Sequence, residues 1–490
     1  MNIKLPSRVT FSRSVLAGTL ALLLGGCMVG PDYRRPAVAM PAQYRPLPGW
    51  AAAAPAAAAP KGAWWTMFGD PLLEELEPQV AVSNQTVRQS YANYQAALAE
   101  VRVARGALFP AIGIDGTASR QRSAAGSAVS GVERLHTVST SGSLEGSVSW
   151  APDLWGKVRR TLQENKANAQ ASAAILANAT LSEQTALAGV VIELRTTDAS
   201  IDLLRQTVEA YREYLRVVGN QDAAGTVPPS DLVSARTQLE NVQSSLLALG
   251  IARAQYVHAI AVLVGRNPED LRIPHDGTLP TLPEVPPGVP STLLQRRPDI
   301  AAAERQMAAQ NAAIGVAEAA YYPTLSLSGA DGFSQSPLAG LLHVANHVWS
   351  LGAEVGTTLF DGGERSGEVA AARADYEAAV ANYRGTVLAA LQDVENDLSG
   401  LHILARQAGV LDDAVRDASR GAAIALNEYR TGTVDYTTAA TARATQLSTQ
   451  QDALNVRQQR LLDTVSLIGD LGGGWSADGL GAAPQAGARR

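Results

Sequence analysis

The chain has 490 residues, of which 46% are hydrophobic, 18% are charged and 5% are aromatic, and its formal net charge is −6. An acidic chain without a run of lysine or arginine lacks the basic surface that neutralises phosphates, so nucleic-acid binding is not expected. A single cysteine excludes a disulfide framework and a cysteine-rich metal site. Abundant alanine with few aromatic residues is typical of long, closely packed helices.

The first 26 residues are typical of a secretory signal peptide. Three basic residues precede an apolar stretch over 15–24, which is too short to span a bilayer. The stretch ends in the sequence Leu-Gly-Gly-Cys, which resembles a bacterial lipoprotein cleavage box. We therefore expect residues 1–26 to be removed and Cys27 to carry acyl chains that anchor the protein in a membrane; the alternative is an inert thiol. Lipoproteins of the inner membrane often carry aspartate after the cysteine, so Met28 favours the outer membrane.

Composition divides the mature chain into five segments. They are a lipid-anchored, Pro/Ala-rich extended segment at 27–62, a first repeat at 63–273, a Pro-rich linker at 274–291, a second repeat at 292–471, and a Gly/Ala-rich flexible tail at 472–490.

The two long segments repeat one another in sequence. The aromatic-Pro pairs that end at Pro110 and Pro323 lie 213 residues apart, and the Gly-Thr-Val sequences that begin at Gly225 and Gly432 lie 207 residues apart. The first repeat therefore carries six extra residues between Pro110 and Gly156, as a surface loop tolerates. A duplication held in register over this length predicts that both repeats fold alike.

Each repeat is predicted to begin with a helix and a pair of strands. The Ala-rich helices, near 72–108 and 298–321, end close to a proline. Strands are predicted after them because apolar and polar residues then alternate, most clearly over 144–150 and 351–359.

Two long helices follow each strand pair. Apolar residues recur every three or four positions, as coiled-coil packing requires. The first of the two helices is bounded by glycines 69 residues apart in both repeats, so it spans roughly 100 Å at about 1.5 Å per residue. The chain is then predicted to turn at its Gly-Thr-Val sequence and to return as a helix over 229–265 or 436–470.

The number of strands predicts an oligomer. Four strands per chain cannot close a membrane barrel, which needs about eight or more, and open sheet edges are not tolerated in lipid. Three chains would supply twelve strands and would combine their long helices into a tube. The expected fold is therefore mainly α with a small β part: a trimeric α-helical barrel continued by a 12-strand transmembrane β-barrel. With a lipid anchor, this arrangement predicts a conduit across the periplasm.

Three sequence motifs carry a family resemblance. They are CMVGPDYRRP at 27–36, WW followed by FGDP at 64–71, and RRPDI followed by AER at 296–305. In this order they resemble the outer-membrane efflux lipoproteins, the NodT branch of the TolC-like outer membrane factor family, and the resemblance covers about 27–471. It implies the outer-membrane channel of a tripartite efflux pump that exports small toxic compounds or drugs.

The resemblance also implies partners and a location. A homotrimer would lie in the outer-membrane lipid and extend into the periplasm. It would work with a periplasmic adaptor (membrane fusion) protein and an inner-membrane transporter, commonly of the resistance-nodulation-division type. The channel would have no catalytic chemistry and no cofactor apart from the covalent lipid on Cys27.

The helix turns are the candidate docking sites for the adaptor. The resemblance assigns this role to Gly225, Thr226, Val227, Gly432, Thr433 and Val434. Glycine at such a turn permits the positive φ that ends a helix, so ordinary turns without a docking role are the alternative.

The candidate periplasmic gate lies just past the turns. Related channels narrow there with rings of aspartate. Where the family often reads Leu-Asp-Ala, this chain has Ala-Thr-Ala at 440–442. We expect a gate formed by Asp231 and Asp435, with Thr438 and Thr441 as uncharged rings. Both carboxylates also lie where an aspartate stabilises a helix start, so helix capping is the alternative.

Other classes of protein fit the sequence less well. An enzyme is not expected, because HExxH, CxxC, GxSxG and phosphate-loop motifs do not occur. His343 and His347 have the spacing of metal ligands on a helix, yet they precede a predicted strand, where a loop or interfacial role is expected. A periplasmic adaptor protein would have one helical hairpin, and a non-channel coiled-coil scaffold would need no alternating strands. The channel of a type I secretion system shares the whole architecture and stays open as an alternative.

Overall fold

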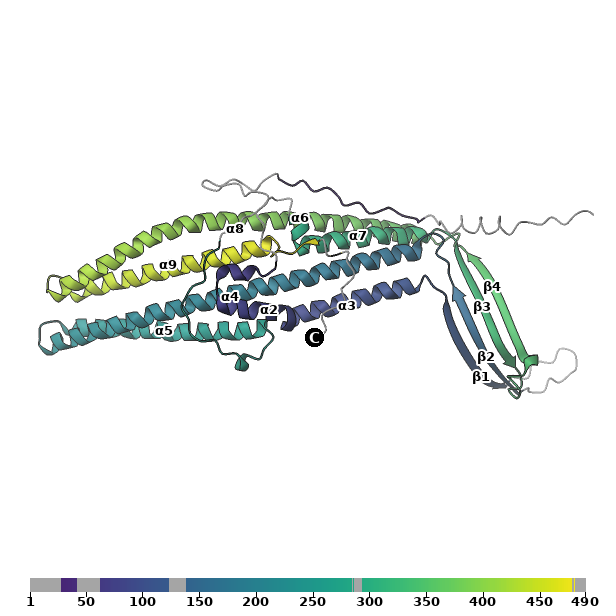
Figure 1. Cartoon of the computed structure of the whole chain (residues 1–490), viewed down its shortest axis with the longest axis horizontal. Coiled ribbons are helices and arrows are strands. Elements are labelled where there is room, and N and C mark those ends of the chain that lie inside the picture. Colours follow the sequence, from purple (N-terminus) through teal and green to yellow (C-terminus); the bar gives the residue numbers. More distant parts are fainter. Residues whose placement is uncertain are drawn as a thin grey trace, which may run out of the picture. The chain divides into compact units, whose positions relative to one another are not determined.

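The computed structural model describes residues 28–41, 62–122, 138–283, 285, 293–477 and 480 (Figure 1). Cys27 lies outside the described residues. The chain divides into two compact units. Unit 1 contains 96–169 and 305–381 together with the N-terminal residues up to Pro36, and unit 2 contains the described residues of 37–95, 170–304 and 382–490.

The helices and strands follow the predicted order in both repeats. In the first they are η1 (Trp64–Phe68), α2 (Pro71–Ser83), α3 (Gln85–Gly106), β1 (Ala111–Arg122), β2 (Val138–Trp150), α4 (Lys157–Ala223), α5 (Pro229–Leu263) and η2 (Pro268–Asp270). In the second they are α6 (Leu293–Arg296), α7 (Pro298–Ala319), β3 (Thr324–Gln335), η4 (Val344–Asn346), β4 (His347–Gly356), α8 (Glu364–Arg430) and α9 (Tyr436–Asp470).

The repeats match in the lengths of their elements. α4 and α8 have 67 residues each, and α5 and α9 have 35 each. β1 and β3 have 12 residues each, whereas β2 has 13 and β4 has 10. The connection inside the strand pair is also longer in the first repeat, 123–137 against 336–346. The extra residues of the first repeat therefore lie in the strand pair and its connection.

Unit 1 contains a four-stranded antiparallel sheet in the order β1-β2-β3-β4 (Figure 1). The middle pair, β2 with β3, joins the two repeats in register from Gly142 opposite Gln335 to Trp150 opposite Leu327. Within this sheet β1 and β4 are edge strands, each paired on one side. Their outer backbone groups are free to pair with another strand.

The residues that follow Cys27 pack against helices of unit 1. The Val29 N–H donates to the Trp155 carbonyl at 3.0 Å. Arg160 is 3% exposed and donates from Nε to the Val29 carbonyl at 2.9 Å and from Nη2 to the Gly30 carbonyl at 2.8 Å. Gly30 has φ +92°, and a Cβ there would lie 2.4 Å from the Cα of Gly315. We call residues 28–36 the strap, because these contacts hold an extended segment on the helices.

The helix predicted over 72–108 is divided at Asn84. Its side-chain Oδ1 accepts from the N–H groups of Thr86 and Val87 at 2.8 and 3.1 Å and so caps α3. Its Nδ2 donates to Glu183 and to the Leu263 carbonyl at 2.8 and 2.9 Å. The break is therefore fixed by partners that lie far away in the sequence.

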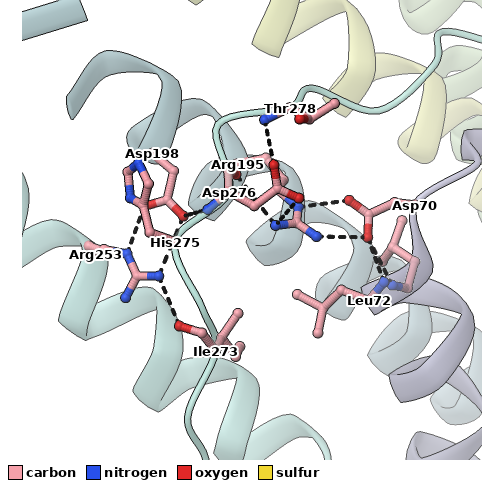
Figure 2. Close-up of polar contacts among 10 residues, drawn as sticks. Asp70, Leu72, Arg195, Asp198, Arg253, Ile273, His275, Asp276 and Thr278 are labelled. Carbon is pink, nitrogen blue, oxygen red and sulfur yellow. Dashed lines mark hydrogen bonds and ion pairs between the residues drawn. The ribbon is translucent and has the colours of Figure 1, made fainter. Parts of the chain in front are cut away.

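A network of buried ion pairs joins four segments of unit 2 (Figure 2). Asp70 caps α2 through the Leu72 N–H at 2.7 Å and also accepts from Nε of Arg195 on α4 at 2.8 Å. Arg195 reaches Asp276 at 3.0 Å. Burial by itself would lower the pKa of the Arg195 guanidinium. The hydrogen bond to Asp70 and the negative charges of Asp70 and Asp276 outweigh burial and raise this pKa.

The second half of the network is centred on Asp198, which is fully buried on α4. It accepts from Nε of Arg253 on α5 at 2.6 Å and from the Asp276 N–H at 3.0 Å, and His275 Nδ1 lies 3.0 Å away (Figure 2). Removing one partner of such a network would leave a buried charge uncompensated. The network therefore fixes residues 273–278 on α4 and α5.

The start of the segment predicted as a flexible tail has packing contacts. Trp475 and Leu480 pack against a small cluster formed by Ala174, Ala301 and Ala302 in unit 2. The rest of the segment, 478–479 and 481–490, lies outside the described residues.

A pH dependence of stability is expected from Glu77 on α2. This carboxyl group is fully buried, neither oxygen has a hydrogen-bond partner, and burial raises its pKa to about 9. The folded state holds this proton more tightly than the unfolded state does. The contribution of Glu77 to the free energy of unfolding is therefore complete below pH 4.5 and falls as the pH rises towards 9, by about 1.4 kcal/mol per pH unit at most. Glu77→Gln stays neutral and should flatten this fall in thermal melts between pH 5 and about 9. Glu75→Gln on the exposed side of the same helix is the control, and equal slopes in wild type and Glu77→Gln would contradict the assignment.

Candidate functional site

The sheet of unit 1 has two chemically different faces. Residues opposite one another across the strands share a face, and neighbours along a strand alternate. One face carries large apolar side chains: Ile112, Ile114, Leu144, Val148, Trp150, Leu325, Leu327, Phe333, Trp349, Leu351 and Val355. The other carries hydroxyl side chains: Thr117, Ser119, Ser139, Ser141, Ser143, Ser147, Ser149, Thr324, Ser326, Ser328, Ser334 and Ser350.

The apolar face is exposed in a single chain. Ile112 is 80% exposed and Leu351 is 81% exposed. A contiguous apolar surface of this kind marks a contact with lipid or with another protein. Alternation of apolar-out and polar-in residues is the pattern of a transmembrane β-barrel.

Carboxylates lie on the hydroxyl face. Asp115 is directly opposite Glu145, and Glu354 is opposite Ser326. Like charges directly opposite each other are destabilising, and water reduces that repulsion, so this face is the hydrated one. The four strands place no lysine or arginine on it.

Aromatic residues lie towards both ends of the apolar face. Trp150 is the last residue of β2, at the end that leads into α4, and its Nε1 donates to the Leu108 carbonyl at 3.2 Å. Phe333 and Trp349 lie towards the opposite end. Such positions suit an aromatic girdle at the two membrane interfaces. Trp155 lies just past the end of β2, where its Nε1 donates to the Pro323 carbonyl at 2.7 Å and its ring stacks on Tyr322.

The two helix turns have the same geometry. Gly225 and Gly432 have φ of 69° and 75°. Thr226 donates from both its N–H and its hydroxyl to the Gln221 carbonyl, each at 2.9 Å. Thr433 donates in the same way to the Glu428 carbonyl, at 2.9 and 2.8 Å. These bonds satisfy carbonyls that a helix end leaves free.

Among the six predicted docking residues, the glycines and threonines are exposed, whereas the valines are half-buried. Val227 and Val434 pack against a cluster of residues from α4, α5, α8 and α9. A partner can therefore reach the Gly-Thr pair at each turn, while the valine fixes the turn to the helices below it.

The predicted gate residues are placed just past these turns. Asp435 is the N-cap of α9: its Oδ1 accepts from the Thr438 hydroxyl at 2.6 Å and from the Thr438 N–H at 2.8 Å, and these bonds lower the pKa of Asp435. It thus makes the contacts that the capping alternative requires. Asp231 lies in the first turn of α5, whose N-cap is Pro228, and Thr441 is exposed on α9. The role of the four residues as a gate stays a prediction.

A tyrosine cluster near the gate residues was not predicted from the sequence. Tyr211, Tyr214, Tyr429 and Tyr436 have ring centroids 6.1–6.5 Å apart. Tyr429 donates to Gln221 at 2.6 Å, which links the second turn to the first. Burial, neighbouring tyrosines and the charge of Asp231 raise the pKa of Tyr436 to about 12. In the sequence, these residues show only the spacing of a coiled-coil seam.

Histidine and carboxylate groups do not form a metal centre in the part of the chain that the structure describes, where no three potential ligands come together. His343 occupies the N-cap position of the short helix η4 without a side-chain capping bond, and the Nε2 of His347 lies 2.9 Å from Asp331 on the neighbouring strand. Their spacing in the sequence does not place them on a helix face.

Comparison with known proteins shows the family of this chain. The family described as "Outer membrane efflux protein" matches residues 76–266 and 289–473, once in each repeat. The chain belongs to the outer membrane efflux protein family. It is 30% identical over 458 residues to the antibiotic efflux pump outer membrane protein ArpC and to the toluene efflux pump outer membrane protein TtgC, both of Pseudomonas putida. These alignments cover 93% of this chain and 94% of each relative.

The fold agrees with solved channels of this family. The structure of the outer-membrane channel OprN matches with a TM-score of 0.80 and 29% identity, over 92% of this chain and all of that one. The MtrE outer membrane channel of Neisseria gonorrhoeae matches with a TM-score of 0.78 and 25% identity, over 92% and 99%. The predicted fold class, mainly α with a small β part, is confirmed, and the protein is an outer-membrane efflux protein.

A gating role of the two aspartates can be distinguished from helix capping by variants that remove the negative charge and keep a side chain able to cap a helix. Asparagine caps a helix about as well as aspartate, so Asp435→Asn should preserve stability, and Asp231→Asn removes only a charge in the first turn of α5. Both variants should lower the cation selectivity of purified channels, because rings of like charge attract cations. Single-channel recordings in planar bilayers measure the selectivity. Asp417→Asn, at an exposed position of α8, is the charge-matched control. Unchanged selectivity in the combined Asp231→Asn and Asp435→Asn variant would show that both carboxylates only stabilise the starts of their helices.

Proposed function

We propose that the chain is the outer-membrane channel subunit of a tripartite efflux pump and passes small toxic compounds or drugs to the exterior. The observation that carries this proposal is the sheet of unit 1, with an apolar face, a hydrated hydroxyl face and two open edges. A sheet of this kind suits a barrel that faces lipid outside and water inside.

A homotrimer is the assembly that fits this proposal best. Four strands are too few to close a barrel, and unpaired edges are not stable in lipid. Pairing β4 of one chain with β1 of the next would close a 12-strand barrel with three copies. α4 and α5 are apolar enough to cross a membrane by length and composition alone. The sheet accounts for the membrane crossing without them, and we place the helices in the periplasm.

The names of the relatives indicate the class of compound. ArpC belongs to an antibiotic efflux pump and TtgC to a toluene efflux pump, so small, largely apolar compounds are the proposed cargo rather than secreted proteins. A serine-rich, hydrated lumen offers such molecules no tight apolar site, which favours passage over retention. In this proposal the inner-membrane transporter supplies the energy, the adaptor connects it to the channel, and the channel performs no catalysis.

The strap supports the proposed lipid anchor. Residues 28–36 directly follow Cys27, and Arg160 fixes the carbonyls of Val29 and Gly30. Trp155, whose carbonyl accepts from Val29, lies in the short segment between β2 and α4. Acyl chains on Cys27 would therefore start close to the end of the sheet, where the barrel meets the inner leaflet of the outer membrane.

Export and docking are tested together at the helix turns. Thr226→Trp and Thr433→Trp should abolish export of a toxic compound from cells that lack their own channel, because the bulky rings obstruct the exposed Gly-Thr surface. Purified trimers of the same variants should keep their single-channel conductance. Thr226→Val and Thr433→Val keep the size of the side chain and remove only the hydroxyl hydrogen bond, so they should export nearly normally. Wild-type protein without conductance would refute the channel, whereas full export by both tryptophan variants would refute docking alone.

The anchor is tested at Cys27. Cys27→Ser should yield protein without acyl chains, as mass spectrometry of the mature N-terminus can show, and a larger fraction should be extracted from membranes by mild detergent. Stable anchoring by acyl chains generally needs two of them, and the barrel is a second, independent attachment, so the variant should stay partly in the membrane. A wild-type protein with an unmodified mature thiol would overturn the anchor.

A further inference from the structure

The arginines of the sheet are confined to one corner of it. Arg120 and Arg122, near the end of β1 that is remote from the helices, are the only arginine or lysine residues in the four strands. Their register partners are Thr140 and Val138. Residues an even number of positions apart on a strand lie on the same face. Arg120 and Arg122 therefore share the apolar face with Ile112 and Ile114.

Charge is therefore divided between the two faces of the sheet. The carboxylates of Asp115, Glu145 and Glu354 lie on the hydroxyl face, and the two arginines lie on the opposite one. The carboxylate on the apolar face, Asp331, is bonded to His347 at 2.9 Å and is separated from β1 by β2. Arg120 and Arg122 are exposed, and no carboxylate of the described residues forms an ion pair with them.

The position of the arginines matches a membrane interface. The ten residues from Ile112 to Arg122 rise about 33 Å along the strand, or about 25 Å along a barrel axis at a tilt of roughly 40°. That height equals the apolar band of an outer-membrane barrel, about 25 Å. Charged side chains on the lipid-facing side are costly at the middle of this band and tolerated at its rim. Phe333 and Trp349 lie towards the same end of the sheet, as interfacial aromatic residues do.

We propose that Arg120 and Arg122 form a binding site for the phosphate groups of anionic lipids in the outer leaflet, one site per chain. Guanidinium groups bind phosphate oxygens through two parallel hydrogen bonds. Two of them at alternate positions of one strand have Cα atoms about 7 Å apart, so both side chains can bind phosphate oxygens of the same lipid headgroup. This inference rests on the proposed barrel, because the barrel turns the apolar face towards lipid.

The site is tested with trimers reconstituted in phosphatidylcholine discs that contain a minor fraction of lipid A, a glycolipid with two phosphates. Native mass spectrometry of the released trimers counts the bound lipid A. We expect wild type to retain up to three molecules, and Arg120→Gln/Arg122→Gln to bind about tenfold or more weakly, as the loss of two basic residues at a membrane surface predicts. Arg120→Lys/Arg122→Lys should recover part of the binding. Arg88→Gln/Arg102→Gln, which removes two exposed arginines of α3, should bind like wild type.

The outcomes separate this inference from the proposed channel. Equal retention of lipid A by wild type and the double glutamine variant, with normal conductance in both, would overturn the site and leave the channel intact. A double glutamine variant that loses its trimer, while wild type retains no lipid A, would overturn it too and would show that the arginines contact a neighbouring chain. Wild type without conductance would refute the channel and this inference with it.

Discussion

The open edges of the four-stranded sheet are the constraint on which the rest of this protein depends. β1 and β4 each have one unpaired side, and a sheet with an apolar face cannot leave backbone N–H and C=O groups unpaired in lipid. In the proposed trimer, pairing β4 of one copy with β1 of the next satisfies both edges and keeps the three chains equivalent. In that proposal the closed barrel also decides which face meets lipid and which meets water.

The internal repeat gives each chain two similar helix turns. Equal helix lengths in the two repeats place both Gly-Thr turns at the same distance from the sheet along the chain. At each turn a threonine donates two hydrogen bonds to one carbonyl, which restrains both turns in the same conformation. The repeats differ in the strand pair, in the helices before it (α2 and α3 against α6 and α7), and at the start of the return helix, where Asp435 caps α9 and Pro228 precedes α5.

Access to water decides which charged side chains of this protein need a partner. The buried ions of unit 2 are paired: Arg195 with Asp70, and Asp198 with Arg253, because an unpaired buried charge is strongly unfavourable. Glu77 has no such partner, and its raised pKa keeps it neutral instead. In the sheet, Asp115, Glu145 and Glu354 lie on the hydroxyl face and need no such partner where water reaches them, whereas Asp331 on the apolar face is bonded to His347. In the proposed barrel the hydroxyl face would line a lumen with a negative charge, which suits a conduit.

Periodic local patterns in the sequence determined the order and type of the main elements and the lengths of the long helices. Alternation marked the strands, the three-to-four spacing marked the helices, and the glycines at Gly225 and Gly432 marked the turns, since each signal depends only on neighbouring residues. The tertiary structure alone decided what depends on distant partners. Asn84 breaks a continuous helical pattern because Glu183 and the Leu263 carbonyl hold its side chain. The pairing of β2 with β3 and the tyrosine cluster likewise bring together residues more than 150 positions apart, and no local pattern carries that information.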